Sequence, residues 1–330
     1  MRNDFGVDQA DGLRRLLVTR QTRVITLVAG KSGVGCTSTA INLAAVLARS
    51  GKDVLVLDEN NSPENVLDRL GLHARHDLLD VIQGSRKLRE AVVNAEGFSV
   101  LSTARAMHTL ATSIPHEGNG PRSAKLNQTG QQRLESSLAD LGNGMDVILV
   151  DAALPAPSQF SGHAPVQGMR DDSQVSSYLA RGNSFMVVVD ATASGITEGY
   201  ALIKRLTLEN TRLQFGIVVN KVAGEKAART VFENMAKLAR RNLAARLEYL
   251  GCIPRDDKLK RAAQLGKSVV EAFPAAVSAQ SYMGLALKLL LMPMRQDDAQ
   301  GAVNNAMRDL MQQASQPQRR FSREIAPVVN

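Results

Sequence analysis

The stretch 28-VAGKSGVGCTS-38 decides how the rest of the sequence is interpreted. It follows the phosphate-binding pattern G-x-x-x-x-G-K-[ST], with Gly30, Gly35 and Thr37 in the expected places. The lysine position of that pattern holds Cys36. An apolar run precedes the loop and a helical pattern follows it, which is the setting that such a loop needs. The sequence therefore predicts a strand–loop–helix unit whose backbone N–H groups attract phosphate, with Thr37 placed to ligate Mg²⁺.

Further apolar runs alternate with helical patterns along the chain. The runs are short, nearly continuous and rich in Val, Ile and Leu, which is typical of parallel strands covered on both faces. We expect strands at residues 24–28, 53–58, 98–102, 146–151, 185–190 and 215–220. We expect helices at about 37–50, 63–70 and 276–293. The alternation predicts βαβ units in a doubly wound, mostly parallel sheet, the α/β fold of P-loop NTPases.

The chain divides into three predicted parts. Residues 1–22 form an N-terminal arm, residues 23–293 form the phosphate-binding domain, and residues 294–330 form a C-terminal amphipathic helix and tail. Apolar residues recur at helical spacing over 7–19. Gly12 destabilises a helix there by about 1 kcal/mol relative to alanine. The arm therefore needs a partner or a docking surface.

Two segments inside the domain read as loops, residues 112–130 and 154–173, because both lack periodicity and are rich in Pro, Gly, Ser or Asn. In the tail, residues 299–314 form a weakly amphipathic pattern of Ala, Val, Met and Leu. A membrane-surface helix usually adds bulky apolar and basic residues. Both membrane contact and packing on the domain remain open for this segment.

Composition excludes several classes of protein. The chain has 330 residues, 44% of them hydrophobic, but no run of 18 apolar residues, so no transmembrane helix is expected. The N-terminus carries acids throughout and has no small-residue cleavage site after an apolar block, so it does not read as a signal peptide. Two cysteines without ligand spacing predict neither a disulfide framework nor a structural metal. We expect a cytoplasmic protein, with peripheral contact at the inner face of the cell membrane through the tail as an option.

The net charge of +8 is concentrated in one stretch. Residues 221–270 hold 12 Lys/Arg against 5 Asp/Glu. A clustered basic face suits nucleic acid, anionic lipid or an acidic partner, and a solvated helix face is the plainer alternative. No helix-turn-helix accompanies it, so any DNA contact would be through phosphates.

The loop and the later segments resemble the MinD/ParA ATPases. GKSGVGCTS is similar to their deviant Walker loop, K-G-G-x-G-K-[ST], with Lys31 on the extra signature lysine. VLVLDEN resembles the switch I strand, and ILVDAA the Walker B strand with Asp151 as its acid. GIVVNKV matches the strand whose Asn220 reads the adenine edge, and GCIPRDD matches a later family segment that holds Pro254 and Asp256.

This resemblance implies ATP or ADP with Mg²⁺ as cofactor and an ATP-dependent homodimer in which Lys31 reaches the partner's phosphates. The implied catalytic residues are Lys31, Asp58, Asn60 and Asp151, and the implied Mg²⁺ ligands are Thr37 and Asp151. The implied nucleotide-binding residues are Gly30, Lys31, Ser32, Gly33, Val34, Gly35, Cys36, Thr37, Ser38, Asn220, Pro254 and Asp256.

The pattern departs from the family at three catalytic elements. Cys36 cannot bring the lysine's positive charge to the phosphates, and a hydrogen bond to a charged group is worth about 1.5–3 kcal/mol. Nucleotide affinity is therefore expected to fall roughly tenfold to a hundredfold. Asn60 stands where the second acid of switch I orients the attacking water, and an amide cannot act as a base. Glu59 is placed on the opposite face of the strand.

In switch II, Leu154 and Pro155 stiffen a loop that normally moves with the γ-phosphate. Together the three departures predict a weak or absent ATPase. A separate reading of Cys36 is a reactive thiolate at a helix N-terminus, set against a small residue that is merely tolerated there.

One branch of the family fits best. VDQADGLRRLL resembles the D-Q-A-x-x-L-R arm of the flagellar number regulators, the FlhG/FleN branch, and LGLHARHDLLDVIQGS resembles the segment after switch I in that branch. There the arm engages and stimulates the FlhF GTPase. The implied contact residues are Asp8, Gln9, Ala10, Leu13 and Arg14, and an arm that only packs on its own domain is the alternative.

Three functions stay open on the sequence. The first is an ATP-driven dimer switch that hydrolysis resets. The second is a degenerate module that acts through protein contacts with an FlhF-like GTPase, and with a flagellar transcriptional activator or basal-body protein as further options. The third is a MinD- or ParA-like ATPase that positions cargo on membrane or DNA.

Overall fold

The computed structural model describes most of the phosphate-binding domain. The described residues are 22–60, 63–112, 129–130, 132–133, 136–137, 144–152, 184–209, 214–243 and 245–291. The predicted arm, the predicted loop 154–173 with Leu154 and Pro155, and the tail lie outside these residues. The predictions made for them stay predictions.

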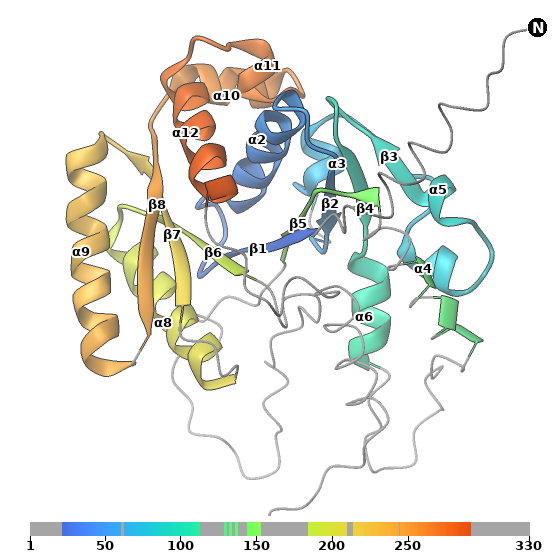
Figure 1. Ribbon diagram of the computed structural model, residues 1–330, viewed down its shortest axis with the longest axis horizontal. Helices are drawn as coiled ribbons and strands as arrows, with labels where there is room; N and C mark the ends of the chain where they lie inside the picture. Colours follow the sequence, from blue (N-terminus) through green and yellow to red (C-terminus); the bar gives the residue numbers. More distant parts are fainter. Residues whose placement is uncertain are drawn as a thin grey trace, which may run out of the picture.

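Eight strands of the described chain form one sheet, in the order β3-β4-β2-β5-β1-β6-β7-β8 (Figure 1). They are β1 (Arg23–Ala29), β2 (Val54–Asp58), β3 (Val92–Asn94), β4 (Ser99–Ser102), β5 (Val147–Asp151), β6 (Ser184–Asp190), β7 (Gln214–Val222) and β8 (Arg246–Pro254). Every neighbouring pair is parallel except β3 and β4. The predicted doubly wound, mostly parallel sheet is confirmed.

All six predicted strands are present, and two strands at the edges of the sheet were missed. The central strands β2 and β5 are buried at every position, which is why their sequences are apolar up to the aspartate that ends each of them. β8 is only partly buried, and its sequence RLEYLGCIP contains charged residues and a glycine. β3 is three residues long. Neither edge strand therefore carries the apolar run on which the prediction relied.

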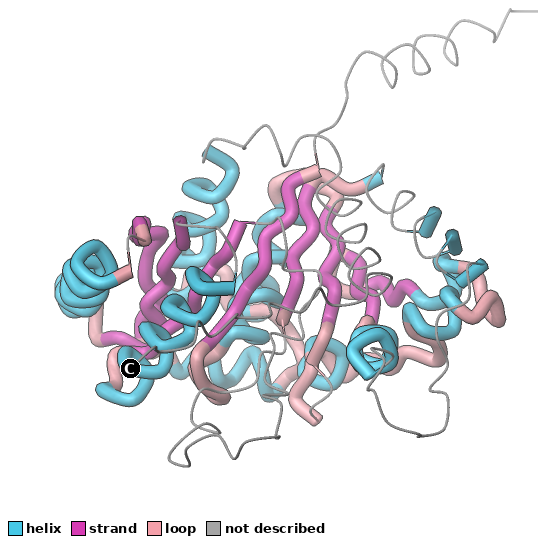
Figure 2. The backbone as a smooth tube through the Cα atoms, turned by 90° about the horizontal axis from the view of Figure 1, so that it is seen from below, coloured by secondary structure: helices cyan, strands magenta, loops and turns pink. Residues whose placement is uncertain are grey.

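Helices cover both faces of the sheet (Figures 1 and 2). One face is covered by α2 (Cys36–Arg49), α3 (Val66–Arg69), α10 (Asp257–Gln264), α11 (Val269–Ala272) and α12 (Val277–Leu291). The other is covered by α4 (Leu78–Ile82), α5 (Leu88–Ala91), α6 (Ala104–Thr112), α8 (Ala193–Glu209) and α9 (Glu225–Asn242). Helical residues at 129–130 shorten the loop predicted for 112–130. None of the described helices is long and apolar enough to cross a membrane.

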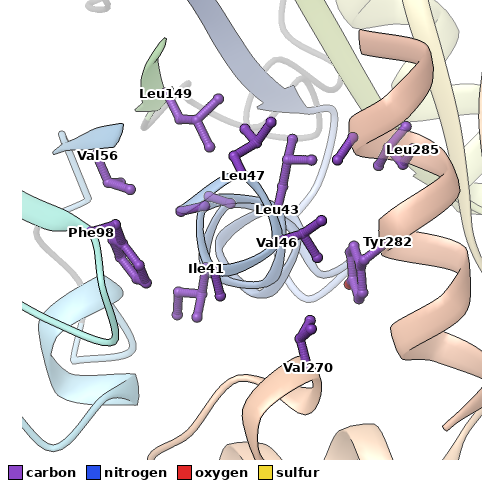
Figure 3. Close-up of a cluster of buried hydrophobic side chains, with 14 of the residues drawn as sticks. Ile41, Leu43, Val46, Leu47, Val56, Phe98, Leu149, Val270, Tyr282 and Leu285 are labelled. Atoms are coloured by element: carbon purple, nitrogen blue, oxygen red, sulfur yellow. The ribbon is translucent and has the colours of Figure 1, made fainter. Parts of the chain in front are cut away.

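Helix α2 is the centre of the larger core. Figure 3 shows Leu43 and Leu47 of α2 lying between Leu149 of β5 and Tyr282 of α12. Leu43, Leu47, Leu149 and Tyr282 have no exposed surface, and full burial of one such aliphatic side chain stabilises the fold by about 1.5–3 kcal/mol. This packing fixes the position of α2, and with it the N-terminal end of α2 that carries the glycine loop.

Candidate nucleotide-binding site

The glycine loop joins β1 to α2 as predicted. Gly33 and Gly35 have φ angles of 76° and 98°, a backbone region that favours glycine. A side chain at Gly30 would place its Cβ 2.2 Å from the carbonyl oxygen of Glu198 in α8. Gly35 is the N-cap of α2 and provides no side-chain cap, so the N–H groups of the first helical turn stay free for an anion.

A cavity of about 930 Å³ opens over this loop. That volume lies in the usual range for small-molecule sites. Of the predicted nucleotide-binding residues, all except Gly30 line the cavity, and so do Asn60 and Asp151. The sheet explains the convergence, because the carboxyl ends of β1, β5 and β7 meet at one edge, where the strand order reverses around β1.

Two buried carboxylates lie side by side beneath the cavity. Asp58 and Asp151 end the neighbouring strands β2 and β5 and are paired in register, with 1% and 2% of their surface exposed. Burial and the charge of Asp151 raise the pKa of Asp58 from 3.8 to about 7. Burial raises the pKa of Asp151 to about 6, although hydrogen bonds from Thr37 and Cys36 lower it. The pair is therefore costly to ionise unless a cation binds nearby.

The Oδ2 atom of Asp151 has no hydrogen-bond partner among the described residues, although it is buried. Thr37 lies beside the same carboxylate and lines the cavity. A buried carboxylate oxygen next to a threonine hydroxyl fits Mg²⁺, which binds few protein ligands and takes the rest from phosphate and water. No cluster of three or more His, Cys, Asp or Glu side chains suited to a metal occurs in the described part of the chain.

Asp58 also organises the chain that follows β2. Its carboxylate accepts hydrogen bonds from the backbone N–H groups of Asn60, at 3.0 Å, and Val66, at 2.9 Å. β2 ends at Asp58, so Glu59 lies one residue beyond the strand, and of the two residues Asn60 lines the cavity whereas Glu59 does not. Glu59 is buried, and its N–H donates to the carbonyl of Asp151.

Lys31 is held within the chain. Its Nζ donates to Ser194 Oγ at 2.8 Å and to Thr192 Oγ1 at 3.3 Å, and lies 3.6 Å from Asp190 Oδ2. These partners lie at the β6–α8 turn: Asp190 ends β6, Thr192 lies in the turn, and Ser194 is in the first turn of α8. Sequence reasoning missed them. One sequence signal could have predicted the contact with Asp190: this residue ends a predicted strand, so it is expected at the same sheet edge as the loop.

Asn220 supports the loop from below. Its Nδ2 donates to the carbonyl of Val34 at 2.7 Å, and its Oδ1 accepts the N–H of Lys221 at 2.8 Å. A Cβ at Gly35 would lie 2.4 Å from Asn220 Nδ2, so the two residues are closely packed. The amide still has one N–H and one lone pair for a base, so the predicted adenine contact stays a prediction.

The cavity carries more cations than the sequence suggested. Five of its lining residues are cationic: Lys31, Arg69, Lys221, Arg255 and Lys260. Three are carboxylates: Glu64, Asp151 and Asp256. The excess of positive charge suits a phosphorylated ligand. Lys31, Lys221 and Arg255 lie in the segments GKSGVGCTS, GIVVNKV and GCIPRDD, but Arg69 and Lys260 lie outside the quoted motifs, and only the fold brings them to the loop.

The basic stretch 221–270 does not act as one surface. Lys221, Arg255 and Lys260 line the cavity. The cations of α9 are exposed on the outside of the domain, interleaved with Glu225 and Glu233. Both earlier alternatives, a phosphate-binding face and a solvated helix face, remain compatible with this placement.

Cys36 is not an activated thiol. Burial and the charge of Asp151 raise its pKa well above the usual value, which argues against the alternative of a reactive thiolate. The helix N-terminus does not outweigh these two effects. The neutral thiol donates to Asp151 and leaves the lysine position without charge.

At pH 7.5 we expect Cys36 to react with iodoacetamide much more slowly than free cysteine, because the thiolate is the attacking species. Mass spectrometry of the labelled peptides, timed over the reaction, measures the rate at Cys36. The urea-unfolded protein is the control and should react at the rate of a free thiol. Equal rates in the folded and unfolded protein would contradict the neutral thiol.

A parallel sheet with a glycine loop at its switch point and two acids at neighbouring strand ends defines a P-loop nucleotide-binding protein. Residues 25–269 match the CobQ/CobB/MinD/ParA nucleotide binding domain, and the chain belongs to that family.

Relatives with known names agree with this assignment. The chain is 30% identical over 268 residues to the antiactivator FleN of Pseudomonas aeruginosa, covering 81% of this chain and 86% of FleN. It is 26% identical to the flagellum site-determining protein YlxH of Helicobacter pylori, covering 79% of each. The fold resembles the septum site-determining protein MinD from Pyrococcus horikoshii, solved in complex with Mg-ADP, with a TM-score of 0.54, 21% identity, and 81% of this chain and 96% of that one covered.

Proposed function

We propose that this protein is a regulator of flagellar number or placement that binds ATP or ADP with Mg²⁺ and hydrolyses ATP slowly or not at all. The observation that carries the proposal is a complete loop and acid pair with a neutral cysteine, Cys36, at the lysine position. The similarity to FleN and YlxH supports the flagellar role. We place the protein in the cytoplasm, with contact at the inner membrane face through its tail.

The residues divide the work of binding. The loop N–H groups and the N-terminus of α2 would hold phosphate oxygens. Thr37 and Asp151 would hold Mg²⁺, which neutralises phosphate charge when bound. Asn60 can orient a water molecule by hydrogen bonding, but it cannot take up the water's proton. Binding without efficient turnover follows from this set of side chains.

A second candidate is an active MinD- or ParA-like ATPase that forms a dimer on membrane or DNA. The same loop supports it, because Lys31, which the family resemblance assigns to the phosphates of a dimer partner, lines the site. Titration with Mg-ATP, with phosphate release followed in the same sample, separates the two. Binding without release supports our proposal, whereas sustained release supports the active ATPase.

Deletion of residues 1–20 is expected to abolish stimulation of an FlhF-like GTPase, because Asp8, Gln9, Ala10, Leu13 and Arg14 form the proposed contact. The measurement is the GTP hydrolysis rate of the partner with and without this protein. Deletion of residues 315–330 is the matched control, removes a similar length of chain, and should leave stimulation unchanged. Stimulation that survives the loss of the arm would overturn its role. We also propose a flagellar transcriptional activator as a further partner.

A further inference from the structure

Arg69, which no motif of the sequence singles out, lies in the nucleotide cavity. It is the last residue of α3 and lines the same cavity as Cys36, Thr37 and Asp151. Its guanidinium lies 2.6 Å from Glu64 Oε2, and its Nε donates to the Glu64 carbonyl at 3.0 Å. About a third of the Arg69 side chain is exposed. The charge of Arg69 therefore lies at the cavity and, within the described part of the chain, is ion-paired only with Glu64.

Helix α3 is hydrogen-bonded to one member of the acid pair, Asp58. The N–H of Val66, in the first turn, donates to the Asp58 carboxylate at 2.9 Å. Asn65 caps the helix by accepting the N–H of Asp68 at 2.9 Å, and Val66 and Leu67 are buried in the core. Arg69 follows within one turn of these anchors. Arg69 and Asp151 line the same cavity, and the strands of Asp58 and Asp151 are neighbours in the sheet.

The other cations of the cavity are engaged elsewhere. Lys31 is bound to the β6–α8 turn. Lys221 donates to the carbonyl of Gly33, and Arg255 donates to the carbonyl of Lys221. Lys260 pairs with Asp257 on α10, and this pair is itself exposed and exchangeable, but α10 has no hydrogen bond to Asp58 in the described chain. Of the five lining cations, Arg69 is the one on α3, the helix that is hydrogen-bonded to Asp58. Asp58 is the in-register neighbour of Asp151, the acid that accepts the hydrogen bond of Cys36.

The partner of Arg69 is easily exchanged. The Glu64 side chain is 75% exposed, and an exposed ion pair contributes little stability. A guanidinium binds phosphate through two parallel hydrogen bonds and keeps its charge at any physiological pH. A polyphosphate in the cavity would therefore compete well for Arg69.

We propose that Arg69 supplies to the nucleotide phosphates the positive charge that the P-loop lysine position lacks in this chain. This inference rests on the proposed binding of nucleotide. With this cation, the protein could bind nucleotide despite cysteine at position 36, because the positive charge would come from α3, after switch I, and not from the loop. Arg69 is then a phosphate-binding residue specific to this sequence.

The test is a calorimetric titration of the full chain and its Arg69→Gln variant with Mg-ATP, Mg-ADP and AMP. We expect Arg69→Gln to weaken Mg-ATP binding by about tenfold, Mg-ADP binding less, and AMP binding hardly at all. The matched control is Arg229→Gln, which removes an arginine that is also ion-paired with a glutamate on a helix but lies outside the cavity. In a Cys36→Lys background the same Arg69→Gln change should cost less than about threefold, because lysine restores the charge.

The outcomes separate this inference from the proposed function. Wild-type binding that Arg69→Gln leaves unchanged, or weakens equally for ATP and AMP, overturns the role of Arg69 and keeps nucleotide binding. A loss that is as large in the Cys36→Lys background as in the wild type also overturns it. No binding by the wild type overturns both proposals, since a substitute cation must give measurable affinity. Thermal denaturation of each variant verifies that it is folded.

Discussion

Replacing Cys36 by lysine is expected to tighten the binding of Mg-ATP by about tenfold to a hundredfold in the Arg69→Gln variant, and by less in the wild type, where Arg69 already supplies part of the charge. The new ammonium would reach the phosphates from the start of α2, and a hydrogen bond to a charged group contributes about 1.5–3 kcal/mol. The side chain of Cys36 lines the cavity, so a longer side chain has room to extend into it. Calorimetric titration with and without Cys36→Lys in each background, under identical salt, measures the change.

Cys36→Ala is the control for this experiment. Alanine removes the thiol without adding charge, so it should leave the affinity within about threefold of the wild type. Adding Asn60→Asp to Cys36→Lys should then raise phosphate release, because a carboxylate can accept the proton that an amide cannot. Tight binding by the wild type that lysine does not improve would show that the lost charge is already fully replaced.

The loop and the central sheet could be predicted because their signals are local. Gly30, Gly35 and Thr37 lie within eight residues of one another, and the inner strands β2 and β5 are apolar up to their terminal aspartates. The edge strand β8 is half exposed and gave no such signal. The register of Asp58 against Asp151 follows from strand order, which no local pattern contains.

The supporting contacts of the site could not be predicted for the same reason. Lys31 reaches Ser194 across 163 residues of chain, and Asn220 reaches Val34 across 186. The hydrogen bond from Val66 to Asp58 is closer in sequence, but it depends on where α3 begins, and that boundary was predicted three residues too early. Arg69 enters the cavity through that anchor. The sequence contains these residues, but only the fold shows what they contact.

Without Mg²⁺ or nucleotide, the protein is expected to lose stability as the pH rises from 5 to 7.5. The pKa of Asp58 is 3.8 when unperturbed and about 7 in the folded protein, so the folded state binds this proton more tightly than the unfolded state. The resulting stabilisation is complete below pH 4 and is lost as the pH rises through 7. The difference corresponds to about 4 kcal/mol.

Asp151 acts in the same direction, since burial raises its pKa to about 6. The two acids interact, so their contributions do not add. The carboxylates whose pKa values are lowered, such as Asp190 and Asp256, are ionised by pH 5 and do not contribute to the change above it. Urea unfolding at a series of pH values measures the free energy of unfolding directly.

Asp58→Asn should remove most of this pH dependence and be more stable than the wild type at pH 7.5. The amide keeps one acceptor for Val66 or Asn60 and loses the other, at about 1 kcal/mol, which is less than the cost of the buried charge. Asp257→Asn, at an exposed position of α10, should keep the wild-type slope. A stability that stays level or rises between pH 5 and 7.5 would refute the prediction.

Mg²⁺ and Cys36→Lys should each flatten the same slope, because either cation favours the ionised acid pair. The pH dependence of the free energy of unfolding therefore measures, without any nucleotide, the effect of the missing positive charge on the acid pair. If Cys36→Lys flattens the slope and also tightens Mg-ATP binding, one absent charge accounts for both properties. If lysine changes the affinity but not the slope, its ammonium lies with the phosphates and away from Asp58 and Asp151, and the acid pair must depend on Mg²⁺ alone.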